Sequence, residues 1–351
     1  MIDLRNLKYA ASWIHRVEVD PGNDWTADAV VAIDAPPDDD AAPSPTAKWP
    51  TTARRSGLCG AVSPRVVVLP EGTLRLYYTQ ILPRPGFPAG ANDYENATTR
   101  ILSAVSTDGV AWQPEEGVRL SPESCGGGVW RVVSSEVVPR VEQAGLRMYF
   151  ECCRGPHSEA NAIRSAVSTD GLTWTVEPGA RLQSPGSNFA APRVLFLDDG
   201  RVRLYSLERG RGIVSAISLD HGLTFEPEAG IRIAPGTSSD RLVAFAPEIV
   251  RVADAGFVMH YAGYETPQRA SIHRAVSDDG LEWKKVERPV IAPSGVGWDA
   301  AKCSEMCLVP SLNADQDNVG IRMLYEACDG TAPDKRGVWR IASATAARLS
   351  G

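Results

Sequence analysis

One short turn motif occurs four times along the chain, each time directly after an apolar, β-branched segment. A serine begins each copy, an Asp-Gly or Asp-x-Gly turn follows, and an aromatic residue ends it. The copies are Ser106 to Trp112, Ser168 to Trp174, Ser218 to Phe225 and Ser277 to Trp283. Asp-Gly between two apolar runs is a strong hairpin signal, because tight hairpin turns need positive φ angles. A strand-based repeat of roughly 50–60 residues predicts a β-propeller or a solenoid.

Two more strands precede each turn, and five copies of this pair can be counted. The first strand of the pair contains, in turn, Ser63, Ser134, Ala191, Ala246 and Cys303. The second strand covers Leu74 to Tyr78, Leu146 to Phe150, Val202 to Ser206, Phe257 to Tyr261 and Ile321 to Tyr325. We therefore predict an all-β fold: a five-bladed β-propeller with four antiparallel strands per blade, in which residues 1–351 form a single domain.

The fifth blade has a third strand at Val338 to Ala344 but no fourth strand after it. An N-terminal strand that joined this blade would close the ring and remove an exposed sheet edge. We predict that a strand within residues 13–33 does so. The Pro- and Asp-rich stretch at about residues 35–50 is typical of a mobile linker.

Composition argues against several classes of partner. The chain has 36 Lys+Arg and 43 Asp+Glu, a net charge of −7, and its basic residues are scattered, which disfavours nucleic acid and anionic membranes. No apolar run approaches the roughly 20 residues that span a bilayer. The N-terminus has no apolar core of a signal peptide, and the seven cysteines show no Cys-x-x-Cys spacing. We expect a cytoplasmic protein with reduced thiols and no metal site.

The repeated Ser-x-Asp-Gly-x-x-Trp turns and the Ala-Pro first strands at Ala191 and Ala246 resemble the five-bladed propellers of glycoside hydrolase families 43 and 32. The looser turn at Ser218 is also similar to that of sialidases, which have six blades rather than five. The resemblance covers nearly the whole chain. It implies a small-molecule or carbohydrate substrate, an Asp base or nucleophile, and a Glu acid on the inner strands near the axis.

The residues that the resemblance would make catalytic are not carboxylates. In family 43 the Asp precedes the proline of the first strand, and that column holds Ser63, Ser134, Ala191, Ala246 and Cys303. The family's acid, two residues before such a proline, would fall at Ala190 or Phe245. The family's catalytic residues therefore do not carry over, and acid–base chemistry would need carboxylates elsewhere.

Charged residues lie two positions further along each first strand: Arg65, Glu136, Arg193, Glu248 and Glu305. Glu151 and Glu326 occupy equivalent places in the second strands. Because side chains alternate along a strand, we expect this set to face the axis. One interpretation is a structural ring of ion pairs that adds little net stability. The other is an active site, in which crowding raises the pKa of one Glu, so that it serves as an acid beside a base.

We favour the active site, with Glu248, Glu305 and Glu136 as catalytic candidates and with Arg65, Arg193, Glu151 and Glu326 as substrate-binding residues. Further binding candidates are His260, Trp130, Trp298 and Cys303. Each also has a plain structural interpretation. Cys303 is either a nucleophile or a small buried apolar residue. His260 binds substrate or an axial cation, or is structural, and the tryptophans stack on a sugar or only pack.

Together these features predict a diverged glycoside-hydrolase-like enzyme that acts on a glycoside or polyhydroxylated small molecule by carboxylate acid–base chemistry in the axial funnel. We expect no cofactor, and an axial cation stays an alternative. A second hypothesis is a cofactor-independent bacterial biosynthetic enzyme that catalyses a cyclisation, elimination or isomerisation on the same propeller. A third is a non-catalytic sugar-binding propeller.

Overall fold

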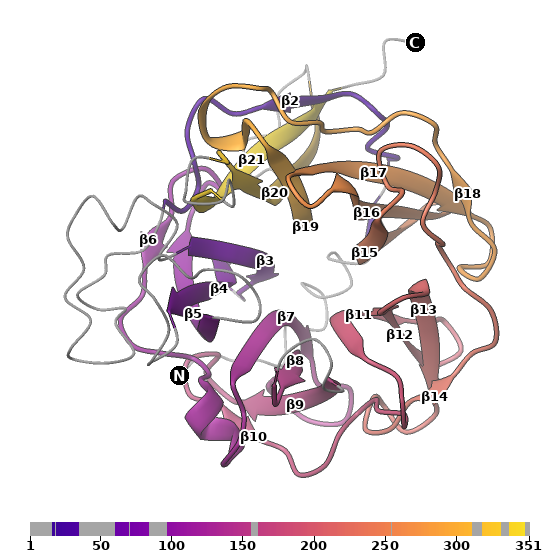
Figure 1. Ribbon diagram of the computed structural model, residues 1–351. Helices are drawn as coiled ribbons and strands as arrows, with labels where there is room; N and C mark the ends of the chain where they lie inside the picture. Colours follow the sequence, from indigo (N-terminus) through magenta and orange to yellow (C-terminus); the bar gives the residue numbers. More distant parts are fainter. Residues whose placement is uncertain are drawn as a thin grey trace.

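The computed structural model describes residues 16–17, 19–34, 60–69, 71–83, 97–155, 161–253, 255–310, 318–330 and 337–347. Four-stranded antiparallel sheets surround a central axis as the blades of a propeller (Figure 1). The all-β, five-bladed prediction is confirmed. The linker predicted at residues 35–50 lies outside the described residues.

The first three blades are separate sheets, and in each the strands follow one another from the axis outward (Figure 1). Blade one contains β3 (Gly60–Val68), β4 (Leu74–Pro83), β5 (Ala97–Ser106) and β6 (Gln113–Pro114). Blade two contains β7 (Arg131–Pro139), β8 (Leu146–Cys153), β9 (Ala162–Ser168) and β10 (Thr175–Val176). Blade three contains β11 (Phe189–Phe196), β12 (Val202–Glu208), β13 (Gly212–Ser218) and β14 (Glu226–Pro227).

Blades four and five are joined into one continuous sheet by a parallel pairing of Ala270 with Lys302. Blade four contains β15 (Val243–Val252), β16 (Gly256–Thr266), β17 (Arg269–Ser277) and β18 (Lys284–Lys285). Blade five contains β19 (Lys302–Pro310), β20 (Asn318–Cys328), β21 (Trp339–Ala347) and β2 (Trp25–Ala27). The short strand β1 (Arg16–Val17) pairs with β15, and two 3₁₀ turns, η3 (Pro122–Cys125) and η4 (Gly297–Asp299), lie between blades in the sequence.

The N-terminal segment closes the ring, as predicted. β2 pairs antiparallel with the C-terminal strand β21, with Trp25 opposite Ala346 and Ala27 opposite Ala344. Blade five thereby gains its fourth strand, and the outer edge of β21 is covered. An additional ion pair anchors this strand, because Asp28 accepts hydrogen bonds from Arg322 and Ser343 of blade five.

A fifth turn of this kind, which we did not predict from the sequence, leads into β2, with Glu18 at the position of the serine. Asp20, Gly22 and Trp25 have the same spacing as Asp220, Gly222 and Phe225 in the third copy. The amide of Gly22 donates to the Asp20 carboxylate at 2.8 Å, and Gly22 has a φ of 71°. The N-terminal segment therefore supplies both the turn and the fourth strand that the other blades take from their own sequence.

The turns join neighbouring blades. In four turns the aromatic residue packs edge-on against a residue of the second strand of the preceding blade, and in three of them the turn glycine accepts a hydrogen bond from this residue, a tyrosine. These pairs are Tyr77–Trp174, Tyr149–Phe225 and Tyr205–Trp283. In blade four His260 takes the place of the tyrosine, and its ring lies 5.7 Å from that of Trp25. The turn motif is therefore structural.

The hydrophobic core lies between adjacent blades. Between blades one and two, for example, Tyr77 and Ile101 pack in one cluster with Val132, Val137 and Phe150, all of them buried. The inner strands β3, β7, β11, β15 and β19 surround the axis (Figure 1), and each contains small and charged residues. The apolar layers thus fix the blades, and the axial ends of the inner strands are left to form a site.

Candidate active site

An open cavity of about 500 Å³ lies where the inner strands of all five blades meet. Its polar lining includes Ser63, Thr79, Thr99, Arg131, Ser134, Glu151, Arg209, Lys302, Glu305 and Glu326. Concave sites of this size that combine apolar walls with a few converging polar groups are typical of small-molecule binding. Of the seven charged residues that we predicted at the axis, three line this cavity: Glu151, Glu305 and Glu326.

Three donors contact the carboxyl group of Glu305. Its Oε2 accepts hydrogen bonds from the hydroxyls of Ser63 at 2.9 Å and Ser134 at 3.0 Å. Its Oε1 lies 3.2 Å from Nη2 of Arg193, which is buried below the cavity. A guanidinium and two hydroxyls stabilise negative charge on a carboxylate. Glu305 is therefore suited to act as a base or a nucleophile.

Glu326, on the neighbouring strand β20, is in a different environment. It accepts a hydrogen bond from the backbone N–H of Ser63 at 2.8 Å and another from the hydroxyl of Ser304. Burial, and then the nearby charge of Glu305, raise the pKa of Glu326 to about 8. This shift favours the neutral, protonated form of the side chain. Two carboxyl groups in one site whose environments favour opposite protonation states form an acid–base pair.

A β-bulge places Ser63 between the two carboxyl groups. The pairing of β3 with β4 shifts between Val62 and Arg65, and Ser63 has a φ of 55°, which a residue other than glycine rarely adopts. Ser134, Ala191 and Ala246 have positive φ angles at the equivalent bulges of blades two to four. The column that we aligned from the sequence is therefore a set of bulges in these four blades, and the bulge of blade one turns Ser63 toward both carboxyl groups.

In blade five the alignment from sequence was one residue out of register in both strands, so Glu326 corresponds to Phe150 and not, as we predicted, to Glu151. The bulge of β19 lies between Cys303 and Met306, so it comprises Ser304 and Glu305. Glu305 therefore corresponds to Pro64 of blade one. Met306, which pairs with Tyr325, corresponds to Arg65. This difference explains why Glu305 reaches the cavity, whereas the charged residues that we aligned with it in the other four blades do not.

Those four residues form a buried ion network that does not line the cavity. Arg65 contacts Glu136 at 2.7 Å and Glu248 at 2.9 Å, and Arg193 lies 3.3 Å from Glu248. Backbone amides complete the network, since Val194 donates to Glu136 and Leu308 donates to Glu248. Burial raises the pKa of Glu136 to about 7, although the adjacent Arg65 opposes this shift. The protein therefore has both a ring of ion pairs and a cavity with carboxyl groups. Glu136 and Glu248 belong to the ring of ion pairs.

Three basic side chains and several aromatic rings complete the cavity. Nζ of the buried Lys302 lies 5.1 Å from the ring centre of Trp339 and 6.0 Å from that of Tyr264, within the range of cation–π attraction. Arg209 lies 3.5 Å from Glu151. The third basic residue is Arg131. We predicted none of the three from the sequence, although Arg131 and Lys302 are direct neighbours of two residues that we did name, Trp130 and Cys303.

The remaining candidates do not line the cavity. Cys303 is fully buried, and burial raises the pKa of its thiol, which disfavours a nucleophilic thiolate. His260 is also fully buried, between Trp25 and its own blade, and burial lowers its pKa to about 3. Trp130 lies beside the guanidinium of Arg131 at 6.0 Å, and Trp298 packs against the core of blades four and five. The structural interpretation accounts for the places of His260, Cys303 and Trp298.

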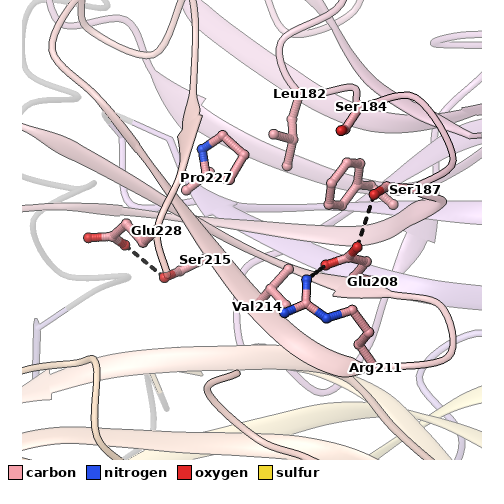
Figure 2. A pocket seen from close by; sticks show the side chains of 11 residues that line it. Leu182, Ser184, Ser187, Glu208, Arg211, Val214, Ser215, Pro227 and Glu228 are labelled. Carbon is pink, nitrogen blue, oxygen red and sulfur yellow. Dashed lines mark hydrogen bonds and ion pairs between the residues drawn. The ribbon is translucent and has the colours of Figure 1, made fainter. Parts of the chain in front are cut away.

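A second, smaller cavity of about 140 Å³ lies in blade three (Figure 2). Its carboxylates are engaged within the cavity wall: Glu208 by Ser187 and Arg211, and Glu228 by Ser215. It shares no lining residue with the axial cavity. Because its polar groups satisfy one another, it offers no converging set of groups for a ligand.

Disulfides, metal sites and membrane-spanning helices each place requirements on the described residues. The six cysteines within the described part of the chain are free thiols. No group of three His, Cys, Asp or Glu side chains among the described residues is arranged to hold a metal ion. None of the helical segments that the structure describes has the length and apolar character needed to cross a bilayer.

Comparison with known proteins shows the fold. No family model and no curated protein matches the sequence. Three solved structures superpose on most of the chain. A thermostable family-43 glycoside hydrolase is 17% identical, with a TM-score of 0.60 over 82% of this chain and 90% of its own. The catalytic domain of a family-62 α-L-arabinofuranosidase from Coprinopsis cinerea is 14% identical, with a TM-score of 0.63 over 93% and 98%.

The third structure is a protein solved as a complex with RGII. It is 13% identical, with a TM-score of 0.66 over 100% of this chain and 97% of its own. These identities are too low to transfer an activity, because one fold hosts many functions. The chain has the propeller fold of glycoside hydrolases of families 43 and 62.

Proposed function

We propose that the protein is a glycoside-hydrolase-like enzyme that cleaves a glycosidic bond in the axial cavity, with Glu326 as the general acid and Glu305 as the base or nucleophile. The observation that carries this proposal is the shared contact with Ser63, whose hydroxyl binds Glu305 and whose amide binds Glu326. It brings the two carboxyl groups, of which Glu326 has a raised pKa, to one point of the cavity wall.

In this mechanism Glu326 gives its proton to the leaving oxygen while the bond from the anomeric carbon to that oxygen breaks. Glu305 either attacks the anomeric carbon or takes a proton from the water that attacks it. Positive charge that develops on the sugar is stabilised by the carboxylate of Glu305. Arg193, Ser63 and Ser134 hold this carboxylate in place through the hydrogen bonds described above. Arg131, Arg209 and Lys302 are placed to bind substrate oxygens.

Glu248 and Glu136, two of our catalytic candidates from sequence, have a positioning role in this proposal. Both are buried in the ion network with Arg65, and neither lines the cavity. Arg193 bridges the network and the site, because it contacts Glu248 on one side and Glu305 on the other. The network therefore fixes the guanidinium that in turn orients Glu305.

A panel of aryl α- and β-glycosides tests the proposal, with arabinofuranosides, xylosides, fructosides and galactosides as substrates. Wild type should hydrolyse at least one of them, and Glu326→Gln and Glu305→Gln should each lose at least about a hundredfold in kcat, the usual scale of acid–base catalysis. Glu226→Gln, on the exposed strand β14, is the matched control and should retain activity.

Silence of the folded wild-type protein across the panel would contradict hydrolysis. That result would favour our two other hypotheses, a biosynthetic enzyme and a sugar-binding propeller. A proton-transfer enzyme would use the same pair of carboxyl groups on a different bond, whereas a binding module would hold a sugar whose affinity survives Glu326→Gln.

A further inference from the structure

The wall of the axial cavity changes character from blade to blade. Blades five, one and two contribute most of its charged and hydroxyl side chains, among them Lys302, Glu305, Glu326, Ser63 and Arg131. Blades three and four contribute mainly apolar side chains: Ala190, Ala191, Leu207, Leu242, Val243, Phe245, Tyr264 and Pro267. Arg209 is the charged lining residue on that side, and it lies 3.5 Å from Glu151 of blade two. The cavity therefore has a polar wall, which carries most of its charged groups together with Val62, Ile81, Val133 and Trp339, and a second wall that is mainly apolar.

The apolar wall is open to a ligand. The side chain of Leu242 is 53% exposed although it lines the cavity. Beside it Phe245 and Tyr264 are only partly buried, with their ring centres 5.7 Å apart, and Pro267 is exposed. A patch of apolar groups at the mouth of a binding site is a place where a ligand can gain affinity by leaving water.

The two walls face the same cavity, so one ligand meets both. We infer that the substrate is amphiphilic: its reacting sugar lies against Glu305 and Glu326, and an apolar aglycone lies against Leu242, Phe245 and Tyr264. This inference rests on the proposed function and narrows its substrate class to glycosides of aryl or other hydrophobic alcohols. A sugar chain on this side would instead bury hydroxyl groups against side chains that mostly offer no hydrogen bond, which costs free energy.

Binding of non-hydrolysable thioglycosides to wild-type protein tests the inference without turnover. The probes are matched methyl and 2-naphthyl 1-thioglycosides of xylose, galactose and arabinofuranose, with affinities from isothermal titration calorimetry. For the sugar that binds, the naphthyl compound should bind at least about tenfold more tightly than the methyl compound, ~1.4 kcal/mol.

Two serine substitutions locate the effect. Leu242→Ser should reduce the naphthyl preference at least threefold, about 0.6 kcal/mol, since RT is about 0.59 kcal/mol. Leu219→Ser is the matched control, because Leu219 is 80% exposed and lines neither cavity, and it should leave the preference unchanged. Equal affinity for the methyl and naphthyl compounds, no binding of any naphthyl compound, or a preference that Leu242→Ser leaves intact would overturn the inference.

The outcome is separable from that of the proposed function. A naphthyl preference that depends on Leu242, without hydrolysis of any aryl O-glycoside, would support the apolar subsite and reject the glycosidase. Hydrolysis without such a preference would support the glycosidase and reject the subsite.

Discussion

Glu305 and Glu326 accept hydrogen bonds from the same residue, Ser63, one from its hydroxyl and the other from its backbone amide. This arrangement depends on the bulge in β3, where Ser63 has a φ of 55°. Residues held in such sparsely populated conformations tend to occur at functional sites, where the surrounding structure maintains them. Ser63 thus contacts both carboxyl groups from a strained conformation, which Ser134, Ala191 and Ala246 share at the other bulges.

Two substitutions at Ser63 separate its backbone from its side chain. Both variants keep the backbone amide and lose the hydroxyl, but Ser63→Gly relieves the strain of a positive φ, whereas Ser63→Ala retains the strain that the serine already has. Both should lower turnover about tenfold, since each removes a hydrogen bond to Glu305. The glycine variant should be more stable than the alanine variant by about 1 kcal/mol, because only glycine removes this strain. Equal unfolding free energies in urea for the two variants would argue against backbone strain at this position.

The buried network predicts a large stability effect at Glu248. Glu248→Gln leaves Arg65 and Arg193 with one carboxylate fewer in a buried setting. Breaking a buried ion pair in this way costs about 3–5 kcal/mol. Urea denaturation should show this loss, while Glu305→Gln, at the cavity surface, should cost less. A Glu248→Gln variant as stable as wild type would mean that the network is not required for the fold.

The raised pKa of Glu326 makes stability depend on pH. The folded protein binds this proton up to a pKa of about 8, against an ordinary value of 4.5 for Glu. Between these values the folded state holds more protons than the unfolded state, so stability falls as pH rises. The contribution reaches at most about 1.4 kcal/mol per pKa unit. Melting temperatures of wild type and Glu326→Gln should therefore converge at low pH, and the variant should be relatively more stable at pH 8.

His260 predicts an effect of opposite sign. Burial lowers its pKa to about 3, so the unfolded chain takes up a proton near its ordinary value of 6.5 that the folded protein does not. Stability should fall as the pH drops below 6.5, and His260→Phe should weaken this fall. The variant should leave turnover unchanged, because His260 packs on Trp25 and lies away from the cavity lining. A loss of turnover in a folded His260→Phe variant would indicate that His260 is part of the active site.

Closure of the ring by the N-terminal segment predicts that Trp25 is important for stability. Trp25→Ala removes the ring that packs on His260 and weakens the pairing of β2 with β21. Loss of a large aromatic side chain from a packed contact costs about 3 kcal/mol. Chemical denaturation of this variant, and of a chain that lacks residues 1–34, should show reduced stability in both. Unchanged stability in the truncated chain would reject the closing role.

The fold followed from the sequence because each blade repeats the same turn and strand pattern. The fifth turn at Asp20 was missed because its strand partner β21 lies at the other end of the chain. It was harder to predict which side chains of the inner strands point into the cavity. A bulge interrupts the alternation of side chains, so Ser63 lines the cavity while Arg65, two positions later, lies in the buried network. In blade five the bulge lies one residue further along the strand than the aligned position, Cys303, so the register of Glu305 was misjudged.

The protonation state of Glu326 is the most direct measure of the proposed mechanism, because it needs no substrate. Difference infrared spectroscopy of wild type against Glu326→Gln, titrated from pH 5 to pH 9, isolates the carboxyl C=O stretch of this one residue. We predict a protonated carboxyl group at neutral pH that ionises at about pH 8. A carboxyl group already ionised at pH 6 would contradict the assignment of Glu326 as the acid, and with it the proposed division of roles between Glu326 and Glu305.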